Sequence, residues 1–122
     1  MQIGSLIHAA KAPFFSLEFF PPSEAAHLPS FYATVERLHA LNPLFVSVTY
    51  GAGGARRHNT LAVTAELARR GLTTMPHLTC VGAEPESIAA FLKDLRAAGV
   101  DNVLALRGDP PMSGHWDWKD GY

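Results

Sequence analysis

The sequence predicts a parallel α/β fold and, within that class, the N-terminal half (about four βα units) of a (β/α)8 TIM-type barrel. Short apolar runs typical of strands alternate with longer amphipathic stretches typical of helices. The short connections make neighbouring strands parallel, because each helix returns the chain to the same end of the sheet. Several strands also carry polar side chains on one face only, which favours a barrel over an open sheet.

The first part of the chain supplies two strands and two helices. Residues 1–11 are expected to form a short amphipathic helix, and the apolar run at 14–20 is the first expected strand. Ser30 can cap a helix that ends at Asn42, because the following proline cannot continue it. The second strand is expected at 44–48.

The second part repeats this alternation. Asn59 or Thr60 can cap a helix that ends at Gly71, and a third strand lies within residues 73–81. Pro76 weakens that strand, because a central strand uses its backbone N–H groups. The third long helix begins at Pro85 and ends at Gly99, and the fourth strand is expected at 102–106.

The period-two pattern of the strands separates a polar from an apolar face. The polar pairs are Ser16 with Glu18, Ser47 with Thr49, and His77 with Thr79. The opposite faces suit packing against helices and hold Phe15, Leu17, Phe19, Val46, Val48, Leu78 and Cys80. An open doubly wound sheet with small hydroxyl residues in its core is the alternative. It explains the serines and threonines, but a carboxylate is rarely buried without a purpose.

Polar residues also gather where each strand ends. They are Glu18, residues 49–51, residues 77–80 and residues 107–109. In β/α folds the carboxyl ends of the strands form the ligand site, so these residues predict one there. The apolar neighbours of Glu18 favour its protonated form, as a general acid requires, and a pair with an arginine is the alternative.

Three other features can be interpreted either as part of a ligand site or as purely structural. The turn at residues 51–54 lacks the spacing of a dinucleotide fingerprint and is either a plain loop or a close approach to a ligand. His77 either contacts a ligand or lies satisfied in the core. No second histidine or carboxylate has metal-ligand spacing, so no metal site is expected. The residues from Arg107 to Asp109 form either part of the site or a turn salt bridge.

Composition limits the class of protein. The 122 residues are 48% hydrophobic and 17% charged with a net charge of −1, which suits a single partial domain over residues 1–122 and gives no basic excess for nucleic acid. Cys80 is the single cysteine, so no internal disulfide can form. We find no secretory signal and no apolar run long enough to span a membrane. We therefore expect a cytoplasmic protein.

Four motifs resemble those of the methylenetetrahydrofolate reductase family, in its order and at its spacing. They are residues 16–22 (SLEFFPP), 45–54 (FVSVTYGAGG), 77–82 (HLTCVG) and 104–111 (LALRGDPP). The run after the second motif, residues 55–59, departs from the family pattern by lacking its Ser-Thr pair. Together the motifs cover nearly the whole chain, and four in register are highly specific.

The resemblance implies a flavin-dependent β/α-barrel enzyme of one-carbon metabolism and methionine biosynthesis. Such an enzyme binds FAD and uses NADH or NADPH to reduce 5,10-methylenetetrahydrofolate to 5-methyltetrahydrofolate. Glu18 would be the general acid that opens the folate ring to an iminium, and Asp109 would favour that cation. The resemblance places these residues at the flavin: Thr49, Tyr50, Ala52, His77, Arg107, Gly108 and Asp109.

The length of the chain points to half of such an enzyme. A complete barrel needs roughly 250 residues. We therefore expect the 122-residue chain to be inactive alone and to self-associate as a homo-oligomer. The alternative function is a non-catalytic half-barrel that acts only by association with another chain.

Overall fold

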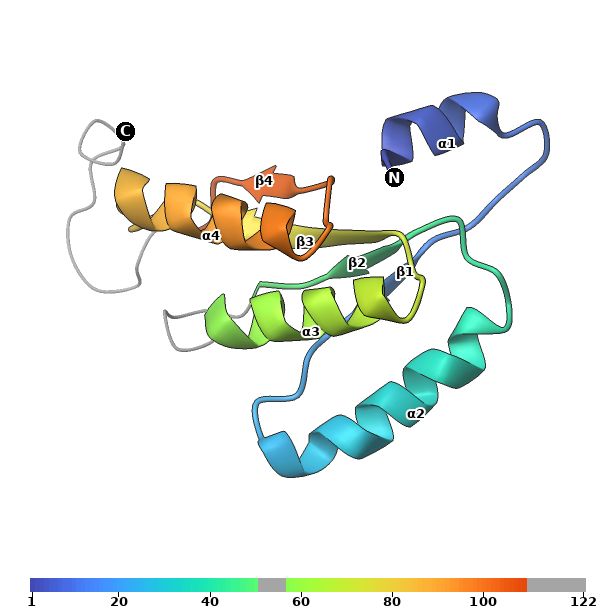
Figure 1. Ribbon diagram of the computed structural model, residues 1–122, viewed down its shortest axis with the longest axis horizontal. Helices are drawn as coiled ribbons and strands as arrows, with labels where there is room; N and C mark the ends of the chain where they lie inside the picture. The colour runs from blue at the N-terminus through green and yellow to red at the C-terminus, as the bar shows by residue number, and fades with distance from the viewer. Residues whose placement is uncertain (51–56, 110–122) are drawn as a thin grey trace.

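The computed structural model describes residues 1–50 and 57–109 (Figure 1). In chain order its elements are α1 (Ile3–Ala9), β1 (Leu17–Phe19), the 3₁₀ turn η1 (Ala25–His27), α2 (Leu28–His39), β2 (Val46–Val48), α3 (Arg57–Arg69), β3 (Thr74–Thr79), α4 (Pro85–Ala97) and β4 (Leu104–Leu106). The order of long helices and strands is the predicted one, although three of the strands are shorter than expected.

The four strands form a parallel sheet in the order β1-β2-β3-β4. The register aligns Leu17 with Val46 and Thr74, so these residues and every second residue after them share one face of the sheet. Helices α2, α3 and α4 all pack against that face, as the two core clusters and Figure 1 show. A parallel α/β fold is therefore confirmed. Helices on one face of a sequentially ordered sheet are consistent with half of a barrel.

Two apolar clusters hold the helices on the sheet. The first joins α2 and α3 to β1 and β2 and has these buried members: Phe19, Val35, Val46, Val48, Val63, Leu67 and Leu72. The second joins α4 to β3 through Leu78, Phe91, Leu95 and Val100, with Cys80 packed beside them. The predicted helix-facing residues of the strands are thus confirmed except Phe15. Phe15 is 44% exposed because it precedes the first residue of β1.

Both predicted helix caps are wrong. Helix α2 begins at Leu28, with Pro29 in its first turn, and the Ser30 hydroxyl donates a hydrogen bond to the His27 carbonyl (3.0 Å). Helix α3 begins at Arg57, so Asn59 and Thr60 lie inside its first turn. The predicted ends hold: α2, α3 and α4 stop close to Asn42, Gly71 and Gly99, all of which adopt left-handed backbone angles.

Pro76 lies in β3 without disrupting the sheet. Alternate residues of a parallel strand bond to opposite neighbours, and the Cys80 N–H bonds to the β4 carbonyl of Leu106 (2.8 Å). Pro76 therefore faces the β4 side. The paired part of β4 begins only at Leu104, opposite His77, so the missing N–H falls before the ladder starts.

The side chain of Asn102 makes hydrogen bonds at the amino end of β3, where β4 does not yet pair with it. Its amide nitrogen donates to the carbonyls of Thr74 (3.3 Å) and Met1 (2.8 Å), and its oxygen accepts from the Ile3 N–H (2.8 Å). Helix α1 is thereby fastened beside the amino ends of β3 and β4. The predicted apolar face of α1 is only partly used, since Ile3 is buried but Ile7 is 44% exposed.

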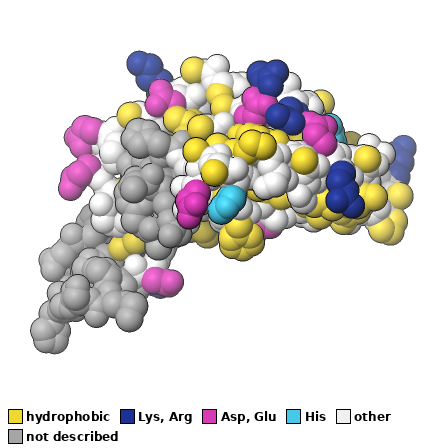
Figure 2. Space-filling view, turned by 90° about the horizontal axis from the view of Figure 1, so that it is seen from below, with side chains coloured by type: hydrophobic (Ala, Val, Ile, Leu, Met, Phe, Trp, Pro, Cys, Tyr) yellow, Lys and Arg dark blue, Asp and Glu magenta, His cyan; other side chains and the backbone are white. Residues whose placement is uncertain are grey.

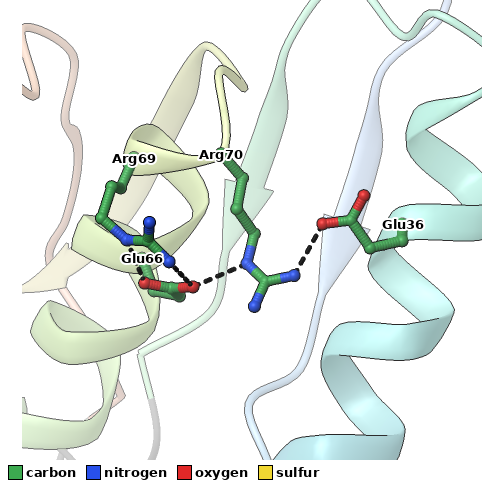
Figure 3. A network of polar contacts seen from close by, with 4 residues as sticks. All are labelled: Glu36, Glu66, Arg69 and Arg70. Atoms are coloured by element: carbon green, nitrogen blue, oxygen red, sulfur yellow. Dashed lines mark hydrogen bonds and ion pairs between the residues drawn. The ribbon is translucent and has the colours of Figure 1, made fainter.

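A charged network joins α2 to α3 (Figure 3). Arg70 contacts Glu66 (2.7 Å) and Glu36 (2.6 Å), and its guanidinium carbon lies 4.6 Å from the ring centre of Tyr32. Arg69 adds two hydrogen bonds to Glu66, at 2.7 and 2.8 Å. These hydrogen bonds lower the pKa of Glu66 from 4.5 to about 2, with Arg69 contributing most. Burial and the Glu66 charge raise the pKa of Tyr32.

Glu66 should therefore contribute stability that depends on pH. Its pKa is lower in the folded than in the unfolded chain, so its contribution is present above pH 4.5 and is lost as pH falls toward about 2. We expect Glu66→Gln to lower the urea midpoint at pH 7 but to change it much less at pH 2. Glu24→Gln, outside the network, is the control. An equal loss at both pH values would show that the carboxylate charge is not the cause.

Candidate functional site

The polar face of the sheet carries the candidate site. The register places Glu18 of β1 opposite Ser47 of β2 and Met75 of β3, and His77 is two residues further along the same face. This face is opposite to the one that the helices cover. The structure therefore brings one member of each predicted polar pair together from three separate strands.

Two of these side chains meet the same oxygen of Glu18. The Ser47 hydroxyl donates a hydrogen bond to Glu18 Oε2 at 3.2 Å. His77 Nε2 lies 3.3 Å from that oxygen, but the contact does not have the geometry of a formed hydrogen bond. The Ser47 residue is 7% exposed and the His77 side chain 13%, so both are held within the sheet. The cluster thus presents one carboxylate on a rigid base of two polar side chains.

The expected apolar surroundings of Glu18 are wrong. Its side chain is 47% exposed. Leu17 and Phe19 precede and follow it, but they point to the opposite face and pack against the helix layer. The alternative of an arginine partner is also not seen among residues 1–50 and 57–109, where the partners of Glu18 are Ser47 and His77.

The first turn of α3 fastens the ends of β1 and β2. The Thr60 hydroxyl donates to the Thr49 carbonyl at 3.1 Å, and Thr60 is 1% exposed. The Asn59 amide donates to the carbonyl of Pro22, in the segment that follows β1. Thr49 itself donates its N–H to the Phe19 carbonyl at 3.0 Å. These contacts give Asn59 and Thr60 a role in place of the predicted caps: they position the carboxyl ends of two strands.

Tyr50 and Ala52 both follow β2, but only Tyr50 lies among the described residues. The ring of Tyr50 packs edge-on against Phe91 of α4, with ring centres 6.1 Å apart. Its ring therefore belongs to the second core cluster, on the helix side of the sheet. Ala52 and the rest of the turn at residues 51–54 lie outside the described residues.

The carboxyl end of β4 places Arg107, Gly108 and Asp109 beside the end of β3. The Arg107 carbonyl accepts a hydrogen bond from the Val81 N–H at 2.8 Å. Arg107 and Asp109 are both exposed. Gly108 has a φ of +89°, and a β-carbon there would lie 2.5 Å from both Thr79 Cγ2 and Val81 Cγ1. Only glycine fits this close turn without displacing its neighbours.

Sequence reasoning proposed most of these residues but missed one contact. It predicted Glu18, Thr49, His77, Arg107, Gly108 and Asp109 at one edge of the sheet, and the structure places all of them at the carboxyl ends of their strands or next to them. It did not predict that Ser47 and His77 share one oxygen of Glu18. That contact depends on the register between strands, which the period-two pattern of a single strand does not contain.

The described surface mixes charged and apolar side chains on the face shown in Figure 2, where Lys and Arg side chains lie among Asp, Glu and hydrophobic ones. Within the described ranges no group of three His, Cys, Asp or Glu residues is placed to hold a metal ion. None of the helices seen there has the length and apolarity needed to cross a membrane.

Comparisons with known proteins agree on one family. A family model described as methylenetetrahydrofolate reductase matches residues 2–122. The 5,10-methylenetetrahydrofolate reductase of Escherichia coli (strain K12) is 41% identical over 101 residues, which cover 81% of this chain and 34% of that protein. That of Pectobacterium carotovorum subsp. carotovorum is 39% identical over 100 residues, covering 81% of this chain and 34% of that protein.

A plant protein extends the likeness. The methylenetetrahydrofolate reductase (NADH) 1 of Arabidopsis thaliana is 40% identical over 98 residues, which cover 80% of this chain and 17% of that protein. The match thus spans about a third of the length of the bacterial relatives and a smaller share of the plant one.

The tight turn at Gly108 gives a stability prediction. Gly108→Ala should lower the free energy of unfolding by about 2–4 kcal/mol, because the new methyl group adds overpacking to a strained backbone. Gly82→Ala is the matched control, since Gly82 also has a positive φ of +66° but no atom within 4 Å of its added β-carbon. It should cost only about 1–2 kcal/mol. Equal losses in urea denaturation would contradict the close contact with Thr79 and Val81.

Proposed function

This chain belongs to the methylenetetrahydrofolate reductase family, and we propose that it supplies the N-terminal half of a β/α-barrel enzyme that reduces 5,10-methylenetetrahydrofolate to 5-methyltetrahydrofolate. The observation that carries the proposal is the carboxylate of Glu18, held by Ser47 on the polar face of the sheet and contacted there by His77. A barrel would enclose this face, and such enzymes bind their ligands at the mouth formed by the carboxyl ends of the strands.

We assign Glu18 the role of proton donor. Opening the five-membered ring of the substrate breaks a carbon–nitrogen bond, and the leaving nitrogen must take up a proton. A carboxylic acid placed within reach of that nitrogen lowers the barrier by general acid catalysis. Glu18 is suited to this because it stands on a strand, is 47% exposed on the polar face and has one oxygen fixed by Ser47.

The residues at the carboxyl ends fit part of an FAD site. Leu104 and Leu106 lie on the polar face, in register with His77 and Thr79, and are each 37% exposed, so they offer apolar surface to a flat ring. The exposed cation of Arg107 suits a phosphate or an electron-rich ring edge. With Thr49, Tyr50, Ala52, His77, Gly108 and Asp109, it makes up the flavin-binding set that we propose. Bound FAD supplies the hydride chemistry, with NADH or NADPH as the reductant.

Asp109 is proposed to stabilise positive charge during the reaction. Opening the folate ring produces a cationic iminium, and a carboxylate beside it lowers the energy of that charge. Asp109 is exposed and follows the turn at Gly108, which fixes the direction of the chain after β4. Its carboxylate and that of Glu18 therefore have separate roles, one electrostatic and one in proton transfer.

Glu18→Gln should separate the two half-reactions of the complete enzyme. In a full-length protein that contains this chain, we expect folate reduction to slow by about 10²–10⁴-fold, because glutamine cannot donate the proton. Reduction of the flavin by NADH or NADPH should stay nearly unchanged. Stopped-flow measurement of flavin absorbance follows each half-reaction. Glu86→Gln on α4 is the control, and equal slowing of both half-reactions by Glu18→Gln would contradict the acid assignment.

The 122-residue chain alone should self-associate and bind little FAD. Strands β1 and β4 end the described sheet, and their outer edges present backbone groups that a second copy can pair. Half of a barrel also offers half of a cofactor site, while the full entropic cost of binding remains. Sedimentation with detection at protein and flavin wavelengths tests both points. We expect an oligomer without bound flavin and no folate turnover. A flavin-loaded monomer would contradict the half-site argument.

A further inference from the structure

We propose that Ser47 and His77 are positioning residues for Glu18, which hold one of its oxygens and stabilise the negative charge left when it gives up its proton. The inference rests on the proposed role of Glu18 as proton donor and extends it to two further side chains. It also gives the ring of His77 a task other than the flavin contact that the resemblance implies.

The geometry assigns different tasks to the two oxygens of Glu18. Ser47 Oγ and His77 Nε2 both approach Oε2, at 3.2 and 3.3 Å. The contacts of Glu18 with these two side chains do not involve Oε1. Because Oε2 is bonded to Ser47 of β2 and contacted by His77 of β3, rotation of the carboxylate would break its one hydrogen bond to these side chains. Oε1 is therefore the oxygen that carries the proton toward a substrate on the exposed side of the sheet.

Glu18 Oε2 is the available hydrogen-bond partner for the buried Nε2 atom of His77. This Nε2 atom is buried and has no aligned hydrogen bond within the described part of the chain. A buried polar atom without a partner is costly, so a native structure normally supplies one. Glu18 Oε2 lies at 3.3 Å, and a small rotation of either side chain would align the contact. The structure thus places Nε2 where, when it carries a proton, it would donate to this carboxylate.

The two donors act when the proton leaves. The O–H bond at Oε1 breaks, its electron pair stays on the carboxylate, and the proton goes to the leaving nitrogen of the folate ring. The new negative charge spreads over both oxygens, and Oε2 already faces the Ser47 hydroxyl and the His77 N–H. Donors fixed on strands β2 and β3 need no rearrangement, so they stabilise the charge as it develops. They favour the product of proton transfer more than its start.

Nuclear magnetic resonance of the 122-residue chain with ¹⁵N-labelled histidine rings tests the contact without any cofactor. We expect His77 to carry a proton on Nε2 that exchanges slowly with water, with the peak assigned by its absence from His77→Gln. Glu18→Leu removes the acceptor and should abolish the slow exchange. The exposed rings of His8 and His27 are internal references. If Glu18→Leu leaves the His77 signal unchanged, the contact does not form and the proposal is wrong, whatever the role of Glu18.

Half-reaction kinetics in the full-length protein test the consequence. Ser47→Ala and His77→Ala should each slow folate reduction by about 10- to 100-fold, since each removes one hydrogen bond to a charged group. Ser47→Thr keeps the hydroxyl, and His77→Gln keeps a donor at the position of Nε2, so both should recover most of the rate.

Matched variants separate positioning from folding. Thr64→Val also removes a buried hydroxyl, on α3, and should leave folate reduction unchanged. If the conservative and the alanine variants were equally slow, Ser47 and His77 would have a packing role and the proposal would fail. Normal folate rates in the two alanine variants would also overturn it. The Glu18→Gln result would still decide the proton-donor assignment separately.

Discussion

The strict alternation of side chains along parallel strands is the constraint on which the rest of this structure depends. Because β1, β2 and β3 align Leu17 with Val46 and Thr74, one face of the sheet is apolar and receives all three long helices. The other face keeps Glu18, Ser47 and His77. A shift of one residue in any strand would exchange these two sets and remove both the core and the site. Stability and candidate chemistry are therefore set by the same register.

Local sequence patterns predicted the order of the helices and strands and the ends of the long helices. The alternation of apolar runs and amphipathic stretches predicted the element order. Gly71 and Gly99 predicted two helix ends because left-handed backbone angles favour glycine, and the proline after Asn42 predicted the third. The candidate site residues were proposed for a related reason: polar side chains that follow an apolar strand stand out against it. Closure into a barrel would depend on contacts beyond the four described strands, so the patterns of these strands do not predict it.

Where prediction failed, a contact distant in sequence outweighed a local preference. Thr60 has the side chain of a helix cap, but its hydroxyl bonds to the Thr49 carbonyl while α3 begins three residues earlier. Glu18 has apolar neighbours in the sequence, but in space it is surrounded by Ser47, His77 and solvent. Pro76 is unfavourable for a central strand in general, yet its position before the first β4 pair leaves no hydrogen bond to lose. Each case required knowledge of which strand lies beside which.

The side chain of Asn102 has a consequence for how the chain acquires this structure. Its bond to the Ile3 N–H joins residues separated by 99 positions, and the same amide also reaches Thr74. Helix α1 is synthesised before the other described elements, but its docking partner leaves the ribosome only after the residues of α2, α3, β3 and α4. Loop closure over such a separation is entropically costly and slows folding. Helix α1 is thus made before the strands it docks on but is among the last of the described elements to dock, and until then it does not cover the amino ends of β3 and β4.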